Sequence, residues 1–274
     1  MQELPKLTDR RTLTLNRARA RRIGLAPFLH EEAMAEIKER LALVNRRFTK
    51  PAVVTAFPEL WAELLPKARM VADEDTLALD TQAHDLVIHA MCLHWANDPV
   101  GQIIQCARAL QPDGLFLAAL PGGRSLQELR ASLAEAESRL RGSLSLRVLP
   151  MGEIRDLGGL LGRAGLALPV ADSLLLPASY RNLAHLAQDL RAMGEGNALA
   201  ARRRTPAPRA VFDLASRIYA ESYPAEGGRI SASYELIFLT GWTPHPSQQK
   251  PLRPGSALTR LADALNASPG RLDD

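Results

Sequence analysis

The stretch PAVVTAFPELWAEL, residues 51–64, decides the fold, because an aliphatic run of strand character passes directly into a helical pattern. Further short aliphatic runs follow in ARMVAD (68–73), HDLVIHAM (84–91) and GLFLAAL (114–120), with helical segments such as DPVGQIIQCARAL between them. Strands that alternate with helices predict a parallel, doubly wound α/β sheet.

The remaining chain predicts one domain over residues 1–257. Helices are expected at 8–48, capped by Thr8 and Asp9, the sheet core at 51–170, and a mainly helical insertion with the last strand at 171–243. Residues 258–274 are expected to form a flexible tail.

Composition indicates an ordinary globular protein. Of 274 residues, 46% are hydrophobic and 23% charged, which excludes disordered and collagen-like classes. The net charge of +4 is mild, and no zinc finger or RNA-binding aromatic motif accompanies it, so no nucleic-acid partner is predicted. Cys92 and Cys106 lack a CxxC pattern, and His84, His89 and His185 lack metal-ligand spacing, which predicts a reducing compartment and no metal site.

The longest apolar runs, such as LFLAAL (115–120), are far shorter than the roughly 20 residues that span a bilayer, so no transmembrane segment is predicted, while peripheral membrane contact stays open. The arginine-rich start, residues 1–22, lacks the continuous apolar core of a secretory signal. We therefore expect a cytoplasmic protein, with an interfacial or organelle-targeting helix as the alternative.

The first strand-to-helix turn lacks glycine. Open α/β sheets bind ligands at the switch point of the strand order, where turn glycines let backbone approach the ligand. Here the turn carries Phe57 and Pro58, with Trp61 on the first helical turn, and these residues are predicted to plug the site. Asp73 lies about 20 residues after the turn, where an acid accepts hydrogen bonds from ribose hydroxyls; a helix cap or solvated loop is its alternative role.

His94 and Trp95 follow the end of the strand at 84–91, at the edge where α/β active sites form. The imidazole is a weak candidate for a catalytic base and the indole for a stacking wall. In the alternative interpretation, Trp95 packs the sheet edge and His94 bonds a backbone carbonyl. The GxSxG pattern of a serine hydrolase is absent.

Four stretches carry a family resemblance: TDRRTLTLNRARA, the region from HDLVIHAMCLHWANDP to ASLAEAE, DLRAMGEGNA, and LTGWTPHPSQQKPLRPGSA. Through them, residues 8–257 resemble the class I methyltransferase superfamily, in the group of the mitochondrial complex I assembly factor 5 and its bacterial relatives, near the biotin-synthesis malonyl-carrier methyltransferases. The resemblance implies a Rossmann-like fold that binds S-adenosylmethionine (SAM). It places Asp73 near the adenine, with His94 and Trp95 as further cofactor-binding candidates.

TAFPELW departs from the glycine-rich loop of that family, and the following interval is shorter by about one βα unit. This departure implies weak or absent SAM binding. We therefore expect no cofactor and a pseudoenzyme that acts as a non-catalytic assembly or scaffold factor, possibly of respiratory complex I. Its partner would be a respiratory-complex subunit or an intact paralogue. The alternatives are an active SAM-dependent methyltransferase and a protein arginine hydroxylase.

The polar segment near the C-terminus is the candidate surface for binding a protein partner, because its polar residues are hard to explain by packing. Its candidate residues are Trp242, His245, Gln248, Gln249 and Arg253. A strand-capping role for Trp242 is the alternative.

Overall fold

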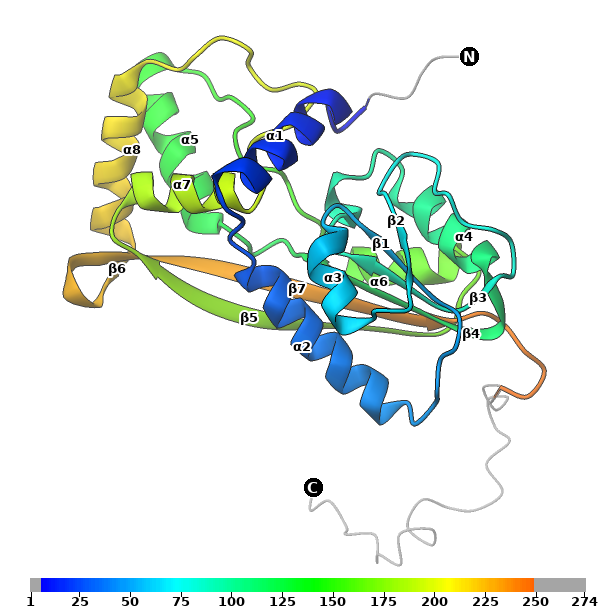
Figure 1. Ribbon diagram of the computed structural model, residues 1–274. Coiled ribbons are helices and arrows are strands. Elements are labelled where there is room, and N and C mark those ends of the chain that lie inside the picture. The colour runs from blue at the N-terminus through cyan, green and yellow to red at the C-terminus, as the bar shows by residue number, and fades with distance from the viewer. Residues whose placement is uncertain (1–5, 249–274) are drawn as a thin grey trace, which may run out of the picture. The chain divides into compact units, whose positions relative to one another are not determined.

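The computed structural model describes residues 6–248 and divides the chain into two units, Met1–Pro244 and His245–Asp274. In the first unit, seven strands form one sheet in the order β2-β1-β3-β4-β7-β5, with β6 paired to β7 (Figure 1). The strands are β1 Pro51–Thr55, β2 Arg69–Val71, β3 His84–Ala90, β4 Leu110–Pro121, β5 Ala167–Tyr180, β6 Pro224–Ala225 and β7 Arg229–Trp242. The predicted boundary after residue 257 lies outside the described residues and stays a prediction.

The four strands β1 to β4 pair in parallel, which confirms the predicted α/β class. The sheet is mixed rather than wholly parallel, because β7 pairs antiparallel with β4 and β5. The chain runs outward from β1 to β2 and returns to β3 on the other side of β1, so the switch point lies between β1 and β3. Fully formed sheets of this kind carry a third strand beyond the second. Here three-residue β2 ends the strand order, and residues 72–83 return to β3 without a helix, which confirms the predicted truncation.

Eight α-helices surround the sheet in the described part of the chain (Figure 1). They are α1 Arg10–Ile23, α2 Phe28–Leu43, α3 Pro58–Leu64, α4 Pro99–Ala109, α5 Gln127–Arg141, α6 Ile154–Arg163, α7 Leu183–Ala192 and α8 Arg209–Ser222. Asp9 caps α1 as predicted, because its carboxylate accepts a hydrogen bond from the Thr12 backbone N–H at 3.0 Å. Helices α5, α7 and α8 gather at the end of the β5–β7 pair that extends past the other strands.

The sheet extends further along the sequence than predicted. Strand β5 runs to Tyr180, whereas the sequence pattern ended the sheet core at residue 170 and assigned 171–243 mainly to helices. Its hydrogen-bond partner is β7, with Val170 opposite Thr240 and Tyr180 opposite Ile230. The identity of this partner, some 60 residues away, cannot be read from the local sequence pattern. Within this segment, helix is confined to residues 183–222, apart from the short 3-10 helix η2 (Glu226–Gly228).

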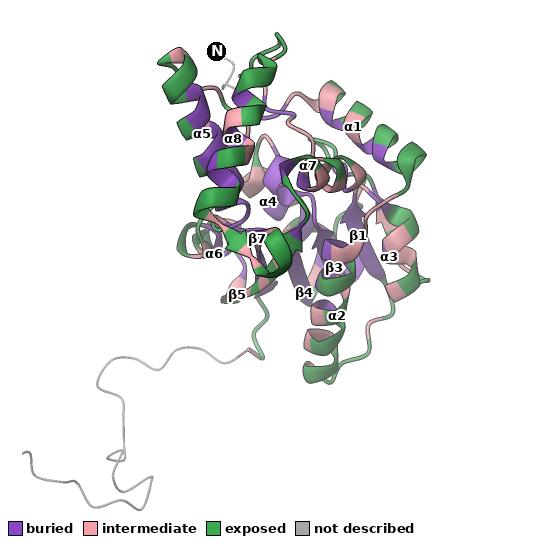
Figure 2. Cartoon of the chain, turned by 90° about the vertical axis from the view of Figure 1, so that its left-hand side faces the viewer, coloured by how far each residue is buried: buried purple, intermediate pink, exposed green. Residues whose placement is uncertain are grey.

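The core lies on both faces of the sheet, as the buried interior in Figure 2 shows. Every residue of β1 and β3 is buried, which is typical of parallel strands covered on both sides. Val53 packs in the cluster with α2 and α3, and its neighbour Val54 packs in the cluster with α4 and α6. The alternation of side chains along one strand thus supplies two hydrophobic layers.

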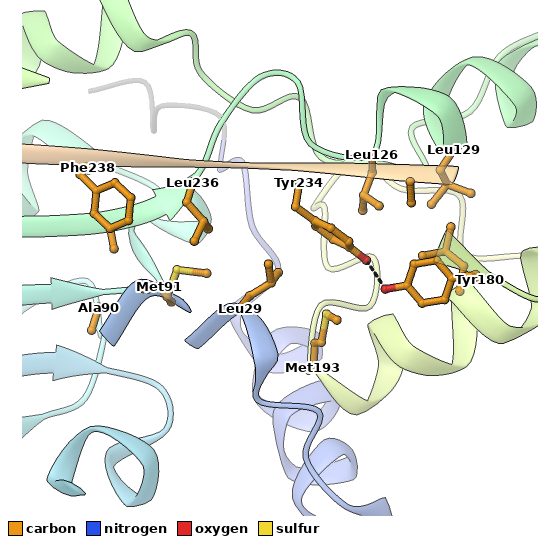
Figure 3. Close-up of a cluster of buried hydrophobic side chains, with 14 of the residues drawn as sticks. Leu29, Ala90, Met91, Leu126, Leu129, Tyr180, Met193, Tyr234, Leu236 and Phe238 are labelled. Atoms are coloured by element: carbon orange, nitrogen blue, oxygen red, sulfur yellow. Dashed lines mark hydrogen bonds between the residues drawn. The ribbon is translucent and has the colours of Figure 1, made fainter. Parts of the chain in front are cut away.

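Two tyrosines join the extended strands to α7 (Figure 3). The hydroxyls of Tyr180 on β5 and Tyr234 on β7 lie 2.9 Å apart, and the Tyr180 hydroxyl donates to Asp189 of α7 at 2.9 Å. Leu126 and Met193 lie beside them in the same cluster. Because burial raises the pKa of both tyrosines, the hydroxyls stay neutral, and their hydrogen bonds let polar groups enter this apolar layer.

Replacing Trp61 should cost much of the stability. The indole is fully buried, and its Nε1 donates to His30 Nδ1 at 3.0 Å. Trp61→Ala should lower the free energy of unfolding by about 3–5 kcal/mol, because it leaves a cavity and an unused imidazole acceptor. The measurement is urea unfolding beside the control Leu43→Ala. Leu43 is 84% exposed, so its replacement should cost less than about 0.5 kcal/mol. A loss for Trp61→Ala as small as that of the control would contradict this packing.

Candidate functional site

Helix α1 closes over the carboxyl ends of β1 and β2, beside the switch point. Arg21 donates to the carbonyl of Ala56 in the β1–α3 turn at 2.5 Å and pairs with Glu59 of α3 at 2.7 Å. Arg10 donates to the backbone carbonyl of Asp73, the second residue after β2, and lies 3.4 Å from its carboxylate. One helix therefore contacts both loops where a ligand of this fold would bind.

Asp73 is bound by a second arginine of the same helix. Nη1 of Arg17 lies 2.8 Å from Oδ1 and 2.9 Å from Oδ2 of Asp73, and both side chains are 7% exposed. The acid predicted to meet a ribose is therefore held as a buried ion pair with α1. The alternative of a solvated loop residue does not describe it, since Asp73 is buried.

Phe57 joins three segments at the turn after β1. Its ring packs edge-on against the His30 ring of α2 at 5.3 Å between centroids, and the Arg21 guanidinium lies 4.9 Å from its centroid. Gly194, which follows α7 with φ of +80°, approaches so closely that a Cβ there would lie 3.0 Å from the ring. The turn residue thus contacts α1, α2 and the segment after α7.

The other two residues predicted to plug the site, Pro58 and Trp61, differ in position. Pro58 is exposed, occupies the first turn of α3 and lines a cavity beside α1. Trp61 lies deeper, in the hydrophobic core next to α2, and does not line that cavity. Their effect on cofactor binding stays a prediction.

The cavity under α1 has a volume of about 340 Å³. Its lining consists of Arg10, Thr14, Arg17 and Arg21 of α1, Thr55, Ala56 and Pro58 of the turn, and residues 70–74. A nucleoside site of this fold uses turn glycines and an available acid. The turn here has no glycine, and the acid is paired with arginine, so these residues do not fit that mode of cofactor binding.

His94 and Trp95 meet a carboxylate that the sequence did not single out. Both lie in the short η1 helix, Leu93–Trp95, and both are buried. Oε2 of Glu195 accepts a hydrogen bond from Trp95 Nε1 at 2.7 Å and lies 3.1 Å from His94 Nε2. Burial opposes ionisation of Glu195, but the attraction of His94, their hydrogen bond and the charge of Arg17 lower its pKa below the usual value. The geometry is that of an acid–imidazole–indole cluster in which both rings are buried and the carboxylate is half-buried.

A small apolar cavity of about 70 Å³ lies against this cluster, with Trp95, Glu195, Leu126 and Tyr234 among its walls. Trp95 is a packing residue, but it packs with Leu13 of α1 and with Leu149 rather than with the predicted sheet edge. His94 bonds a carboxylate rather than a backbone carbonyl.

The sequence reasoning missed Arg10, Arg17, His30 and Glu195. The sequence did hold a signal for Glu195, because the stretches LHWANDP and DLRAMGE both carry the family resemblance. The structure brings His94 of the first stretch to Glu195 of the second. For Arg17, the signal was an arginine-rich helix that bears no acid between residues 10 and 23.

The predicted partner surface divides between the two units. Trp242 ends β7, is half-buried, pairs with Leu115 and Ala167, and lies 5.8 Å from the Arg46 guanidinium, which agrees with a strand-end packing role. His245 and Gln248 belong to the second unit, where the Gln248 side chain accepts from the His245 backbone N–H at 3.2 Å. Gln249 and Arg253 lie outside the described residues, and partner binding stays a prediction.

Within residues 6–248, no three His, Cys, Asp or Glu side chains group to hold a metal ion. No helix in that range combines the length and apolar character needed to cross a bilayer. Cys92 and Cys106 are buried free thiols, and burial raises the pKa of each.

Replacing Arg17 should show how much free energy it costs to bury the Asp73 carboxylate without this partner. Arg17→Met should lower the free energy of unfolding by about 3–5 kcal/mol, because the Asp73 carboxylate is left with only Arg10 nearby. Adding Asp73→Asn removes that charge and should restore part of the loss. Urea unfolding of both single variants and the double variant gives the coupling energy. Additive losses would contradict a buried ion pair.

The buried imidazoles should make stability depend on pH. Burial lowers the pKa of His30 and His89 from 6.5 to about 4, so the unfolded chain binds more protons between these values. The free energy of unfolding should therefore fall as pH drops from 6.5 toward 4, by up to about 1.4 kcal/mol per pH unit for each imidazole. His30→Gln should reduce the slope in urea unfolding, and exposed His245→Gln should not. Equal slopes in all three proteins would exclude His30 as a cause.

Comparison with known proteins agrees with this fold. Residues 36–118 match the model of a methyltransferase domain. The chain is 36% identical over 199 residues to the mitochondrial arginine-hydroxylase NDUFAF5 of Danio rerio, covering 73% of this chain and 62% of the relative. It is 29% identical over 188 residues to the malonyl-[acyl-carrier protein] O-methyltransferase of Laribacter hongkongensis, covering 69% and 61%.

Among solved structures, phosphoethanolamine N-methyltransferase 2 of Haemonchus contortus in complex with S-adenosyl-L-methionine gives a TM-score of 0.41 at 12% identity, covering 76% of this chain and 53% of that one. The present chain spans less than two thirds of the length of both curated relatives named above.

The prediction of a cytoplasmic protein is wrong, because the NDUFAF5 relatives are named as mitochondrial. It rested on the lack of a secretory core, which separates secreted proteins from others but does not separate cytoplasmic from organelle proteins. The family resemblance is confirmed. The chain carries a methyltransferase domain over residues 36–118 and is similar to the NDUFAF5 proteins and to the malonyl-[acyl-carrier protein] O-methyltransferases.

Proposed function

We propose that the chain is a methyltransferase-fold protein that has lost SAM binding and acts as a non-catalytic assembly or scaffold factor for a respiratory complex. The observation that carries the loss of SAM is the Arg17–Asp73 ion pair, in which a guanidinium of α1 uses both oxygens of the acid. The retained fold and the family resemblance support the scaffold role.

Charge supports this proposal. Three guanidiniums line the cavity under α1, whereas the sulfonium group of SAM is itself a cation. Ribose hydroxyls are neutral and could not replace the Arg17 guanidinium, so a nucleoside that took Asp73 would leave a buried positive charge unpaired. Such a displacement costs several kcal/mol, which a ligand must recover from its other contacts.

The packing around Phe57 also supports the proposed loss of SAM binding. Phe57 is 2% exposed and is held by side chains from α1 and α2 and by the close approach of Gly194. A cofactor at this turn would have to move the ring and at least one of those segments. The closed arrangement suits a protein that presents its surface to a protein partner, which we propose to be a respiratory-complex subunit or an intact paralogue.

Hydroxylation of a protein arginine is a second candidate, and Glu195 favours it. An ionised carboxylate beside an indole is suited to a guanidinium, which it meets by charge-assisted hydrogen bonds and cation–π contact. NDUFAF5 relatives bear the name arginine-hydroxylase. The adjoining cavity of about 70 Å³ would have to open before it received such a side chain.

Calorimetric titration with SAM tests the proposal. The wild-type protein should show no binding up to about 1 mM, which corresponds to less than about 4 kcal/mol. The variant Phe57→Gly/Pro58→Gly should also fail to bind, because it retains Arg17 on Asp73. A malonyl-carrier methyltransferase in the same buffer serves as the positive control.

Micromolar binding by the folded wild type would contradict the proposal and support the active methyltransferase. An oxygen atom added to an arginine of a co-purified partner, detected by mass spectrometry and absent from a deletion strain, would support the hydroxylase instead.

A further inference from the structure

We propose that the cavity under α1 binds a small polyanion, a carboxylate or phosphate compound with at least two acidic groups. This inference rests on the proposed loss of SAM from the same cavity and names what replaces it. The site is the stripe Arg10, Thr14, Arg17 and Arg21 together with the β1–α3 turn.

The stripe is one face of α1. Its four residues are spaced by four, three and four positions, so they lie above one another along the helix, and all four line the cavity. Arg11, Arg19 and Arg22 are exposed and do not line it. The helix therefore directs three guanidiniums to one concave site and leaves three others in solvent.

Three guanidiniums and two carboxylates, those of Asp73 and Glu74, line the cavity. The carboxylate of Asp73 is shared between Arg17 and Arg10, so one negative charge faces two guanidiniums. Arg21 is paired with Glu59, which lies outside the lining and is 42% exposed at its side chain. Glu74 is the other acid of the lining, and it is exposed, so water and salt screen its charge.

Arg17 supplies an independent sign that an acceptor is missing. The residue is 6% exposed, and its Nε and Nη2 atoms are buried without any hydrogen-bond acceptor among the described residues. Buried guanidinium nitrogens are normally satisfied, since an unmade hydrogen bond from a charged group is costly. An anion seated against the stripe would supply acceptor oxygens to these nitrogens once the Arg17 side chain turned them toward the cavity, since both are buried.

The chemical class follows from the donors and the volume. Guanidiniums present pairs of N–H groups that match the oxygens of carboxylates and phosphates. About 340 Å³ is at the lower end of the range for small-molecule sites, which favours a compact ligand over a dinucleotide. Arginines at both ends of the stripe favour a ligand with acidic groups at both ends.

Isothermal titration of the full chain with citrate and with inorganic phosphate at low ionic strength tests the inference. Citrate, phosphate or both should bind with a Kd below about 1 mM, and binding should weaken as salt is raised. Arg10→Gln and Arg21→Gln should each weaken binding at least about fivefold, because each removes a charged donor from one end of the stripe. Both arginines are partly exposed, with side chains 26% and 41% accessible, so the variants should fold.

Arg19→Gln is the matched control. It removes the same charge from the same helix, on the exposed face and without an ion pair among residues 6–248, and it should change the Kd less than twofold. Preference for citrate would identify carboxylates as the source, and preference for phosphate would identify phosphate compounds.

Lack of binding of both anions up to about 10 mM would overturn the inference, as would equal losses in Arg19→Gln and the stripe variants. The two proposals fail separately. If neither SAM nor the anions bind, only the anion site is refuted. If SAM binds and the anions do not, the loss of SAM is refuted as well.

Discussion

The ion pair between Arg17 and Asp73 determines how the ligand edge of this protein is arranged. Both groups are removed from water, so each needs the other, and the pair fixes α1 to the segment that follows β2. Arg21, one turn further on, then reaches the β1–α3 turn. With α1 in place, the carboxyl ends of the first two strands are covered by an arginine-bearing helix instead of a glycine-rich loop. The proposed loss of SAM and the proposed anion site both depend on that exchange.

A second constraint acts through Phe57. Because a phenyl ring stands where the fold usually needs glycine, the segments above the turn pack on the ring, and Gly194 is required so that the chain after α7 can approach it. The same approach carries Glu195 to His94 and Trp95. Phe57 in place of a turn glycine is thus linked, through packing, to the position of Glu195. Glu195 is the only acid that lines the second cavity in the described structure.

Much of the fold could be predicted because its signals are local. The runs at 51–55 and 84–90 became fully buried parallel strands, and Asp9 became a helix cap, since hydrophobic period and cap chemistry act over a few residues. The long β5 strand was underestimated because its partner is β7, and pairing at that separation is decided by the sheet. Trp61 was expected beside the cofactor, but the direction of its side chain depends on how α3 is rotated against α2.

By itself, the sequence determined the α/β class and the missing turn glycine, because local patterns carry these properties directly. Its motifs carried the family resemblance, which in turn implied the truncated second βα unit. Only the tertiary structure decided that Asp73 is paired with Arg17, that His94 bonds Glu195, and that three arginines of α1 share one cavity. These partners are separated by 56 residues in one case and 101 in the other. Contacts of that kind form only when the packing of helices on the sheet brings the two segments together. Opposite charges that are buried together then stabilise the arrangement.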